Sequence, residues 1–589
     1  MLRSILLFLA AQSIAAQTGN IVDSTWFTDQ QIRSMHLSST GAHVYTTLFD
    51  TPNIVLRDND TAHFSHNVRT VRPTPDEGVL IMTESDGMWT LHRWKVGTPP
   101  MPLTTSTTPM EIVGVRHADR FVVTQGSFDQ KIVIEVDTLS NVRHLDTVEN
   151  ALDVVVDDNH VIRGIQPPLR DLMDFRRIGF RSFISILSVS GDGERLYRTI
   201  EGPNGRCWLV VERNGVQQTL VSSDDGDILP IGHTIDDRTG DVIFAVSTFG
   251  TMSRHIVDSR YAHELAFVTS ITRREVAILG RSRDGTTYLV RTNDGGPFLY
   301  LRGRLIDGKT IVDTLAVDPP APDDGHRRRQ RFVVTSRDGR RLPCSMVRAD
   351  STRPGPTIIA IHGGPWVPFL QNSWYVTRIH RMLADRGWNV IHAEFRGTPG
   401  YGRDFIEASR GEWGRAMRHD LEDIADAAIQ SGTADRSTVA LYGWSYGAYA
   451  VLDLLTSDTA QRFVGGIALY GVYDLVDIMR SPTGANDVWW SYVGNPAVRE
   501  DSLRLVEASP IHRVNNLHVP LLVSHGALDE RCAIAHSDNL VDQCRQLGKN
   551  VTYVRYDDEG HDYSRPSSWL RLWNVAAPFL DSLRTNTSP

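Results

Sequence analysis

The chain has 589 residues, a formal net charge of −9 and a hydrophobic content of 41%. This length predicts more than one domain, and the composition is typical of globular proteins with sizeable cores. The weak negative charge, spread over so many residues, is the opposite of a basic nucleic-acid-binding surface, so no nucleic-acid partner is expected.

The N-terminal segment has the pattern of a secretory signal peptide. Arg3 precedes a short apolar run at 5–11, and the small residues Ser13, Ala15 and Ala16 follow. The pattern predicts a signal peptide over residues 1–16 and an exported protein, periplasmic or secreted; the alternative is a buried N-terminal helix. The apolar run is too short to cross a bilayer, and no later stretch resembles a membrane span.

Four cysteines are present, Cys207, Cys344, Cys532 and Cys544. Export permits disulfides, and four cysteines allow three pairings between which the sequence does not choose. Free buried thiols are the interpretation we favour. No Cys-x-x-Cys or His-rich spacing appears, so no metal site is expected.

Residues 36–320 are predicted to be β-structure, because short β-branched and aromatic runs alternate with turn residues and no long helical periodicity is present. The turn markers recur at intervals of about 40 residues, the length of one propeller blade. They predict a β-propeller of about seven blades, with a pair of β-sandwiches as the alternative. The markers lie near Gly41, Gly78, Asp119, Asp158, Gly193, Gly240 and Gly285.

A Pro- and Gly-rich linker follows at 318–325, and we expect the basic triplet at 327–329 to be solvated with it. After the linker, apolar strand-like runs such as 357–361 and 520–523 alternate with helical stretches. This alternation predicts a parallel sheet with helices on both faces over residues 331–589.

One segment of this second domain carries the pattern of a nucleophilic serine. A predicted strand enters Gly443-Trp444-Ser445-Tyr446-Gly447, and a helix of small residues leaves it. In a Gly-x-Ser-x-Gly turn the serine lies on a strained strand-to-helix connection, where its hydroxyl is exposed at the helix N-terminus. The pattern alone is weak, so its context decides.

The context supplies two partners in the order that α/β-hydrolases require. Asp529 follows the strand at 519–523, and His561 follows the strand at 552–556. Each residue taken alone is commonly a helix cap or a loop residue. All three at strand ends, in the order Ser, Asp, His, predict a catalytic triad of Ser445, Asp529 and His561.

An oxyanion hole is predicted at the loop His362-Gly363-Gly364-Pro365, which follows the strand at 357–361. Two glycines let a backbone N–H approach a reacting carbonyl. The N–H groups of Gly364 and Tyr446 are the expected donors. We expect His362 to brace the loop rather than to carry a proton.

The order propeller then hydrolase, with these motifs, resembles the prolyl oligopeptidase family of serine peptidases, and the His-Gly-Gly-Pro loop is most similar to its acylaminoacyl-peptidase and dipeptidyl-peptidase-like branch. Further motifs support the resemblance: the stretch 396–402, Trp413-Gly414 with Asp420 and Asp423, the pair His525-Gly526 before Asp529, and Glu559-Gly560 before His561. The resemblance implies that Arg531, two residues after Asp529, contacts a substrate peptide carbonyl, and that the propeller limits access to short peptides.

The sequence therefore predicts a serine peptidase of short peptides that works through an acyl-enzyme and needs no metal or organic cofactor. Two alternatives stay open: an esterase or other acyl hydrolase, since triad and oxyanion hole serve both chemistries, and a binding protein with an unused hydrolase fold. The preferred residue before the cleaved bond, the choice between exo- and endopeptidase activity, and the oligomeric state are not predicted.

Overall fold

The computed structural model of the protein describes residues 32–585, apart from 49–53, 167–185, 319–328, 350–353, 367–373 and shorter gaps. The predicted signal peptide and most of the predicted linker lie outside the described residues. No helix in the described part of the chain is long and apolar enough to cross a membrane.

The first domain is a β-propeller, as predicted. Its described residues form seven small antiparallel sheets in chain order, of which five have the four strands of a complete blade. The first three sheets are β1 (Ile32–Leu37), β2 (Val44–Leu48), β3 (Ile54–Arg57) and β4 (Asp60–His63); β5 (Asn67–Pro73), β6 (Val79–Ser85), β7 (Met88–Trp94) and β8 (Met101–Ser106); and β9 (Met110–Gly114), β10 (Arg120–Gly126), β11 (Gln130–Asp137) and β12 (Val142–Glu149). The fourth and fifth are β13 (Asp153–Val156) and β14 (Ile162–Gln166); and β15 (Ile186–Val189), β16 (Leu196–Glu201), β17 (Cys207–Arg213) and β18 (Val216–Val221). The last two are β19 (Thr234–Ile235), β20 (Val242–Phe249) and β21 (Thr251–Ile256); and β22 (Val276–Arg281), β23 (Thr287–Thr292), β24 (Phe298–Ile306) and β25 (Lys309–Asp318).

The first and last sheets close the ring. Met35, Leu37 and Val44 of the first sheet share one buried cluster with residues of the last, Leu289, Phe298 and Tyr300. Arg302 also donates to the carbonyl of Ala42, 3.1 Å away. Closure buries the two sheet faces that an open array of blades would leave exposed. The helix α3 (Ala262–Ile271) precedes the last sheet and packs on β24 and β25.

The second domain is built on an eight-stranded sheet of order β26-β27-β29-β28-β30-β31-β32-β33. The first two pairings are antiparallel and the other five are parallel. Its strands are β26 (Gln330–Thr335), β27 (Arg341–Val347), β28 (Gly355–Ile361), β29 (Asn389–Ala393), β30 (Ala434–Trp444), β31 (Gly466–Leu469), β32 (Leu521–Gly526) and β33 (Val551–Tyr556). This is the predicted α/β-hydrolase sheet.

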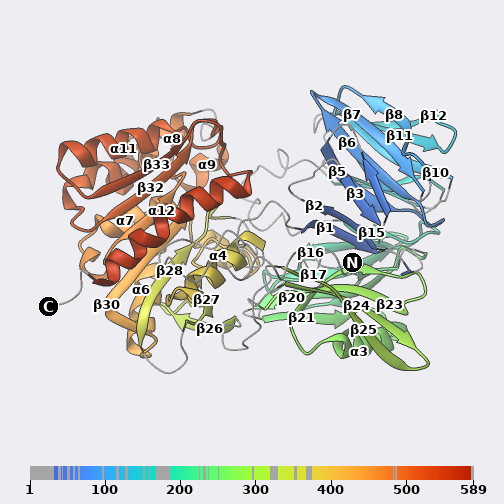
Figure 1. The fold of residues 1–589 in the computed structure, drawn as a ribbon, viewed down its shortest axis with the longest axis horizontal. Helices are drawn as coiled ribbons and strands as arrows, with labels where there is room; N and C mark the ends of the chain where they lie inside the picture. Colours follow the sequence, from blue (N-terminus) through green and yellow to red (C-terminus); the bar gives the residue numbers. More distant parts are fainter. Residues whose placement is uncertain are drawn as a thin grey trace.

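Helices cover both faces of this sheet, as the alternating pattern predicts. One face packs on α4 (Trp374–Asp385) and α12 (Pro566–Thr585) through a cluster that includes Met382 and Trp573. The other face packs on α6 (Ala416–Gln430), α7 (Tyr446–Leu455) and α11 (Ala535–Gln546). The remaining α-helices of this domain in the described residues are α5 (Arg403–Glu407), α8 (Leu475–Arg480), α9 (Asp487–Tyr492) and α10 (Arg499–Ala508). Figure 1 shows this domain in yellow to red beside the blue-to-green propeller.

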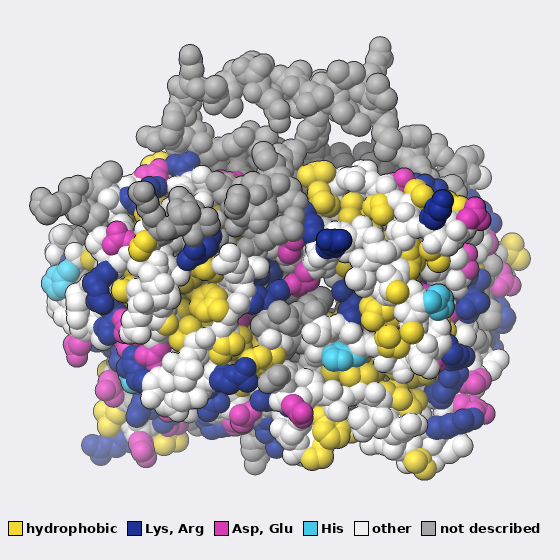
Figure 2. Space-filling view, turned by 90° about the horizontal axis from the view of Figure 1, so that it is seen from below, with side chains coloured by type: hydrophobic (Ala, Val, Ile, Leu, Met, Phe, Trp, Pro, Cys, Tyr) yellow, Lys and Arg dark blue, Asp and Glu magenta, His cyan; other side chains and the backbone are white. Residues whose placement is uncertain are grey.

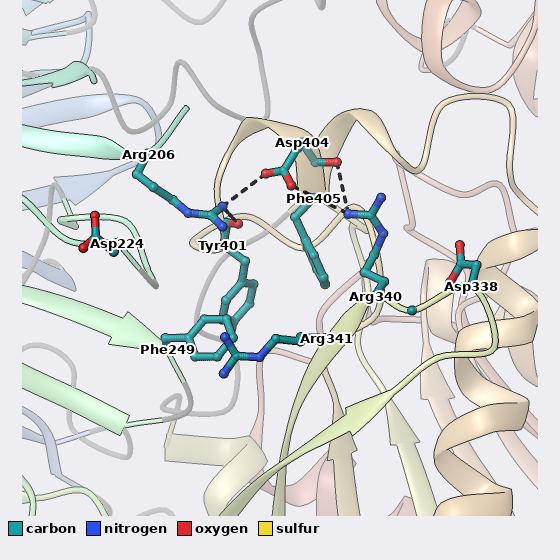
Figure 3. Close-up of a pocket in the computed structure, with 10 residues that line it drawn as sticks. Arg206, Asp224, Phe249, Asp338, Arg340, Arg341, Tyr401, Asp404 and Phe405 are labelled. Carbon is teal, nitrogen blue, oxygen red and sulfur yellow. Dashed lines mark hydrogen bonds and ion pairs between the residues drawn. The ribbon is translucent and has the colours of Figure 1, made fainter. Parts of the chain in front are cut away.

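The two domains are joined at the loop 400–404 of the hydrolase. Asp227 of the propeller accepts hydrogen bonds from Cys207 N–H of its own domain (2.8 Å) and from Gly402 N–H across the seam (3.0 Å). The Arg206 guanidinium donates to the Tyr401 carbonyl and pairs with Asp404. A cavity of about 360 Å³ opens here, and Phe249 and Arg341 are among its lining residues. Figure 3 shows Arg206 and Arg340 approaching Asp404 from opposite sides.

The prediction that the basic triplet is solvated is wrong for Arg329, the one residue of the triplet that the structure describes. Its side chain is buried at the domain junction, where its Nη2 donates to Thr377 of α4 and its backbone N–H to the Asp294 carbonyl. The position of the triplet between two domains, rather than its composition, decides this burial.

We expect the stability of the variant D227N, relative to wild type, to increase with pH. Burial raises the pKa of Asp227 to about 6, although the two N–H donors oppose that rise. The folded protein therefore holds a proton, between the ordinary pKa of 3.8 and pH 6, that the unfolded chain releases, and wild-type stability falls as pH rises through this window. Asparagine does not titrate.

The difference in unfolding free energy between D227N and wild type should move by about 1.5 kcal/mol in favour of the variant from pH 5 to pH 8. Denaturant unfolding of both proteins at the two pH values measures it. D224N, which alters an exposed aspartate of the same propeller edge, is the control and should show no such trend. If the unfolding free energies of D227N and wild type differ by the same amount at both pH values, the assignment of a raised pKa to Asp227 is contradicted.

All four cysteines are free and buried, as favoured from the sequence.

On the face seen in Figure 2, Lys and Arg side chains are interspersed with Asp and Glu rather than gathered into one basic area.

Candidate active site

Ser445 lies on a strained turn between β30 and α7. Its backbone has φ 55° and ψ −119°, a combination that non-glycine residues rarely adopt. The flanking glycines make the turn possible, since a Cβ at Gly443 would collide with the Gly447 carbonyl, and a Cβ at Gly447 with that of Ile361. The Gly-x-Ser-x-Gly pattern therefore has the local structure that the sequence predicts for it.

Asp529 and His561 meet because they follow β32 and β33, which are parallel neighbours and end at the same edge of the sheet. The His561 Nδ1 is 2.8 Å from Asp529 Oδ2. Asp529 Oδ1 accepts the backbone N–H groups of Arg531 and Cys532, each at 2.8 Å. Burial by itself raises the pKa of Asp529, but hydrogen bonds from His525 and His561 outweigh it and hold that pKa well below its ordinary value.

One cavity of about 330 Å³ collects the predicted site residues. Ser445 and His561 both line it, with Asp529 behind His561. Gly364, Tyr446 and Arg531, predicted for the oxyanion hole and for substrate binding, also line it. The six residues selected from the sequence thus lie at one place, although their segments are up to about 200 residues apart.

The loop at 362–365 is packed against the serine. A Cβ at Gly363 would lie 2.9 Å from the Ser445 Cβ, so only glycine allows this approach. Tyr446 is the first residue of α7, and N–H groups in the first turn of a helix have no partner within the helix. The N–H groups of Gly364 and Tyr446 therefore come from two elements that flank Ser445, the arrangement expected of an oxyanion hole.

His362 braces this loop, as predicted. Its ring is buried between the Gly363 carbonyl, 2.7 Å from Nδ1, and the Thr398 hydroxyl, 2.9 Å from Nε2. Burial lowers the pKa of His362 to about 4, so the ring is neutral at neutral pH.

Arg531 has an exposed side chain at the cavity, with a relative exposure of 70%, and its Nη1 lies 3.7 Å from Asp562 Oδ2. Asp562 is its ion-pair partner because the loop after His561 runs beside the loop after Asp529. An exposed pair of this kind is worth about 0–1 kcal/mol, so it can give way to a substrate.

The other motifs of the resemblance have structural partners. Arg396 donates to Asp420 at 2.6 and 2.8 Å and to Asp338 at 2.9 and 3.0 Å, which fixes the loop 396–402 beside His362. Asp423 binds Arg337, and Glu559 binds Arg565. These residues hold the loops that carry the site.

Sequence reasoning missed the apolar wall of the cavity. Val472, Ile478, Met479 and Trp489 line it together with Trp413. They come from α8, α9 and the loop before them, which carry no motif, and only Trp413 stood in a recognisable one. Among the residues that the structure describes, no three His, Cys, Asp or Glu side chains are grouped so that they could hold a metal ion.

The fold and the geometry define an α/β-hydrolase preceded by a β-propeller, with a serine, a histidine and an aspartate at one cavity. Residues 374–583, which make up most of the hydrolase domain, match the model of the prolyl oligopeptidase family. This confirms the resemblance drawn from the motifs.

Curated relatives include the dipeptidyl aminopeptidase BIII of Pseudoxanthomonas mexicana, 29% identical over 66% of this chain and 58% of that protein. Another is the dipeptidyl peptidase family member 6 of Caenorhabditis elegans, 31% identical over 47% of this chain and 36% of that protein. The chain thus spans less than two thirds of the length of either relative.

Solved structures share the whole architecture. A puromycin-hydrolysing peptidase of Mycobacterium tuberculosis superposes with a TM-score of 0.71 over 96% of both chains, at 16% identity. The acylaminoacyl peptidase of Pyrococcus horikoshii gives a TM-score of 0.68 over 96% of this chain and 97% of that one, also at 16% identity. At such identity the likeness concerns the fold alone.

Proposed function

We propose that this protein is a serine peptidase that hydrolyses short peptides through an acyl-enzyme. The observation that carries the proposal is the strained Ser445 in one cavity with His561, whose other ring nitrogen is held by Asp529. The family match of the hydrolase domain and the names of its peptidase relatives support it.

In the proposed reaction, Ser445 Oγ attacks the scissile carbonyl while His561 Nε2 takes its proton. Asp529 holds the Nδ1 proton of His561 and so leaves Nε2 free to act as the base. The N–H groups of Gly364 and Tyr446 donate to the oxygen that becomes negative, an interaction worth about 3–4 kcal/mol for one donor. His561 then gives its proton to the leaving amine, and water releases the acyl group by the reverse sequence.

The cavity wall indicates the side chain before the cleaved bond. Trp413, Trp489, Ile478 and Met479 present aromatic and aliphatic surface beside Ser445, and the Arg and Asp side chains among the described lining residues are those of Arg531 and Asp562. A large apolar side chain buries about 150–250 Å² when aromatic, whereas a carboxylate there would lose its hydration. The proposed substrates therefore carry Phe, Tyr, Leu or Met before the scissile bond.

A panel of peptide anilides tests the proposal. Purified protein should cleave N-blocked and free dipeptide anilides ending in Phe or Leu far faster than the matched anilides ending in Asp. A short-chain p-nitrophenyl ester run beside them separates a peptidase from an esterase. Ester hydrolysis without cleavage of any anilide would replace the proposal by an acyl esterase, and absence of labelling by a fluorophosphonate probe would replace it by a binding protein.

Arg531→Ala is expected to weaken peptide hydrolysis selectively. Arginine offers several fixed donors to a substrate carbonyl, and a charged hydrogen bond is worth about 1.5–3 kcal/mol. The kcat/KM for a dipeptide anilide should therefore fall by a factor of about 10–150. A short-chain ester has no second carbonyl, so its hydrolysis should barely change.

Arg545→Ala is the matched control, because Arg545 is exposed to a similar degree and pairs with Asp542 at 3.8 Å. It should change neither activity. Equal losses on both substrates in R531A would mean that Arg531 braces its loop, and no loss on either would mean that it is a surface residue.

We also propose that the protein is exported by means of the segment 1–16, on the pattern of its sequence. N-terminal sequencing of protein recovered from outside the cytoplasm tests this, and an intact Met1 there would refute it.

A further inference from the structure

The Asp529 carboxylate is enclosed by four donors, and one of its two side-chain donors, His525, has no part in the reaction as described so far. Oδ1 accepts two backbone N–H groups, from Arg531 and Cys532. Oδ2 lies 2.8 Å from His561 Nδ1 and 3.0 Å from His525 Nε2. A carboxylate has about four lone-pair directions, so these contacts saturate it. His525 thus shares with His561 the oxygen that orients the catalytic base.

The chemistry of its neighbours fixes the protonation of the His525 ring. Nε2 faces only acceptors, Asp529 Oδ2 and the Cys532 carbonyl oxygen at 2.9 Å, so it must carry a proton. Nδ1 lies 2.7 Å from the Ser537 hydroxyl of α11, which can donate to it. The ring is wholly buried at the end of β32, and it is therefore held on both sides.

We propose that His525 is a positioning residue for the catalytic base. Its Nε2–H holds Asp529 Oδ2 and the Cys532 carbonyl together, and so fixes the carboxylate in the rotation that meets His561. This rests on the proposed peptidase function and adds a residue to its machinery. The contact between Asp529 and His561 then depends on three elements: the loop that carries Asp529, the end of β32 that carries His525, and α11, whose Ser537 holds the His525 ring.

Several charged and titratable groups of the described residues surround this contact. The Tyr470 ring lies 4.8 Å from the ring of His561, and Tyr473 interacts electrostatically with Cys532. Asp529 and Cys532 belong to its own loop, and His561 lies across Oδ2. His536 of α11 is near enough to interact with His525 electrostatically. At the cavity, Arg531 and Asp562 pair with each other. Removing the His525 donor leaves Oδ2 to His561 alone, which makes that oxygen a stronger acceptor and favours the protonated form of His561.

The test compares H525L with H525Q in the full-length protein, using a Phe anilide substrate. H525L removes the donor, and we expect kcat to fall about 10–100-fold with KM changed by less than about threefold, because the base is misplaced while the binding wall is intact. The acid limb of the pH profile, which is the rise of kcat/KM with increasing pH, should move to higher pH by about 0.5–1 unit. The amide of H525Q keeps an N–H near the same place, so most of kcat and the original acid limb should return.

H380L is the matched control, since it removes another buried imidazole of the same domain that does not line the cavity. It should leave the acid limb in place. If H525L does not fold, S537A takes its place: loss of the hydroxyl that holds Nδ1 should lower kcat less, but in the same direction, and shift the acid limb the same way.

Wild-type kcat and pH profile in H525L, or in S537A where H525L does not fold, would overturn the proposal. Equal losses in H525L and H525Q with an unmoved acid limb would also overturn it, since His525 would then only support the fold. Failure of the peptidase function itself would appear differently, as anilide hydrolysis that persists in S445A or is absent from the wild type.

Discussion

Ser445→Ala should fold like the wild type and lose nearly all turnover, by a factor of order 10⁶. In the proposed mechanism the hydroxyl is the nucleophile, and no other serine lines the described cavity. Alanine keeps the backbone hydrogen bonds of residue 445. Its N–H donates to the Leu469 carbonyl, and its carbonyl accepts from the N–H groups of Ala448 and Tyr449. The positive φ costs alanine about as much as serine, so the melting temperature should hardly change.

The measurements are kcat/KM on a Phe anilide, covalent labelling by a fluorophosphonate probe and thermal unfolding. Ser437→Ala, a change at an exposed serine of the same strand β30, is the control and should behave as wild type in all three. Activity of S445A within tenfold of the wild type would remove Ser445 from the role of nucleophile.

The site could be predicted from the sequence because the close approach of its backbone segments requires glycine at fixed positions. Gly447 and Gly363 stand where a Cβ would strike the chain or Ser445, so their spacing around the serine encodes a close approach that no other residue permits. The closeness of Asp529 and His561 could be predicted because both follow parallel strands, and the carboxyl ends of parallel strands lie at the same edge of the sheet.

The propeller could be predicted from its turns for a similar reason. Gly193 and Gly285 adopt φ 74° and 73° between paired strands, so the repeated turn residue reflects a conformation that favours glycine. The closing contact between the first and last sheets could not be predicted, since Leu37 and Leu289 are joined only by the completed ring.

The apolar wall and the buried Arg329 were missed because their roles depend on tertiary position. Met479 and Trp489 are ordinary helix residues until α8 and α9 are placed over Ser445. Arg329 belongs to a composition typical of linkers, and its burial depends on Asp294 and Thr377 from two different domains. Local pattern predicts the backbone of the site, whereas the shape of its pocket comes from packing between elements.

Asp529→Asn should lower kcat by a factor of about 10⁴ in a protein that still folds. The oxygen of the asparagine side chain is needed by the two backbone N–H groups that now bind Oδ1, so its NH₂ must take the place of Oδ2. There it would donate to His561 Nδ1 and place the ring proton on Nε2, the atom that has to accept the proton of Ser445. It would also face the Nε2–H of His525, donor against donor.

The tautomer argument distinguishes this variant from S445A. D529N keeps the nucleophile and the oxyanion donors, so a fluorophosphonate probe should still label it, only much more slowly, and the decrease in the labelling rate constant should parallel the decrease in kcat. D538N, which alters an aspartate of α11 bonded to the Tyr553 hydroxyl, is the control and should leave both rates unchanged. A kcat for D529N within tenfold of the wild type would mean that His561 is oriented by some other group, and the four-donor shell around Asp529 would then stabilise the loop and not the base.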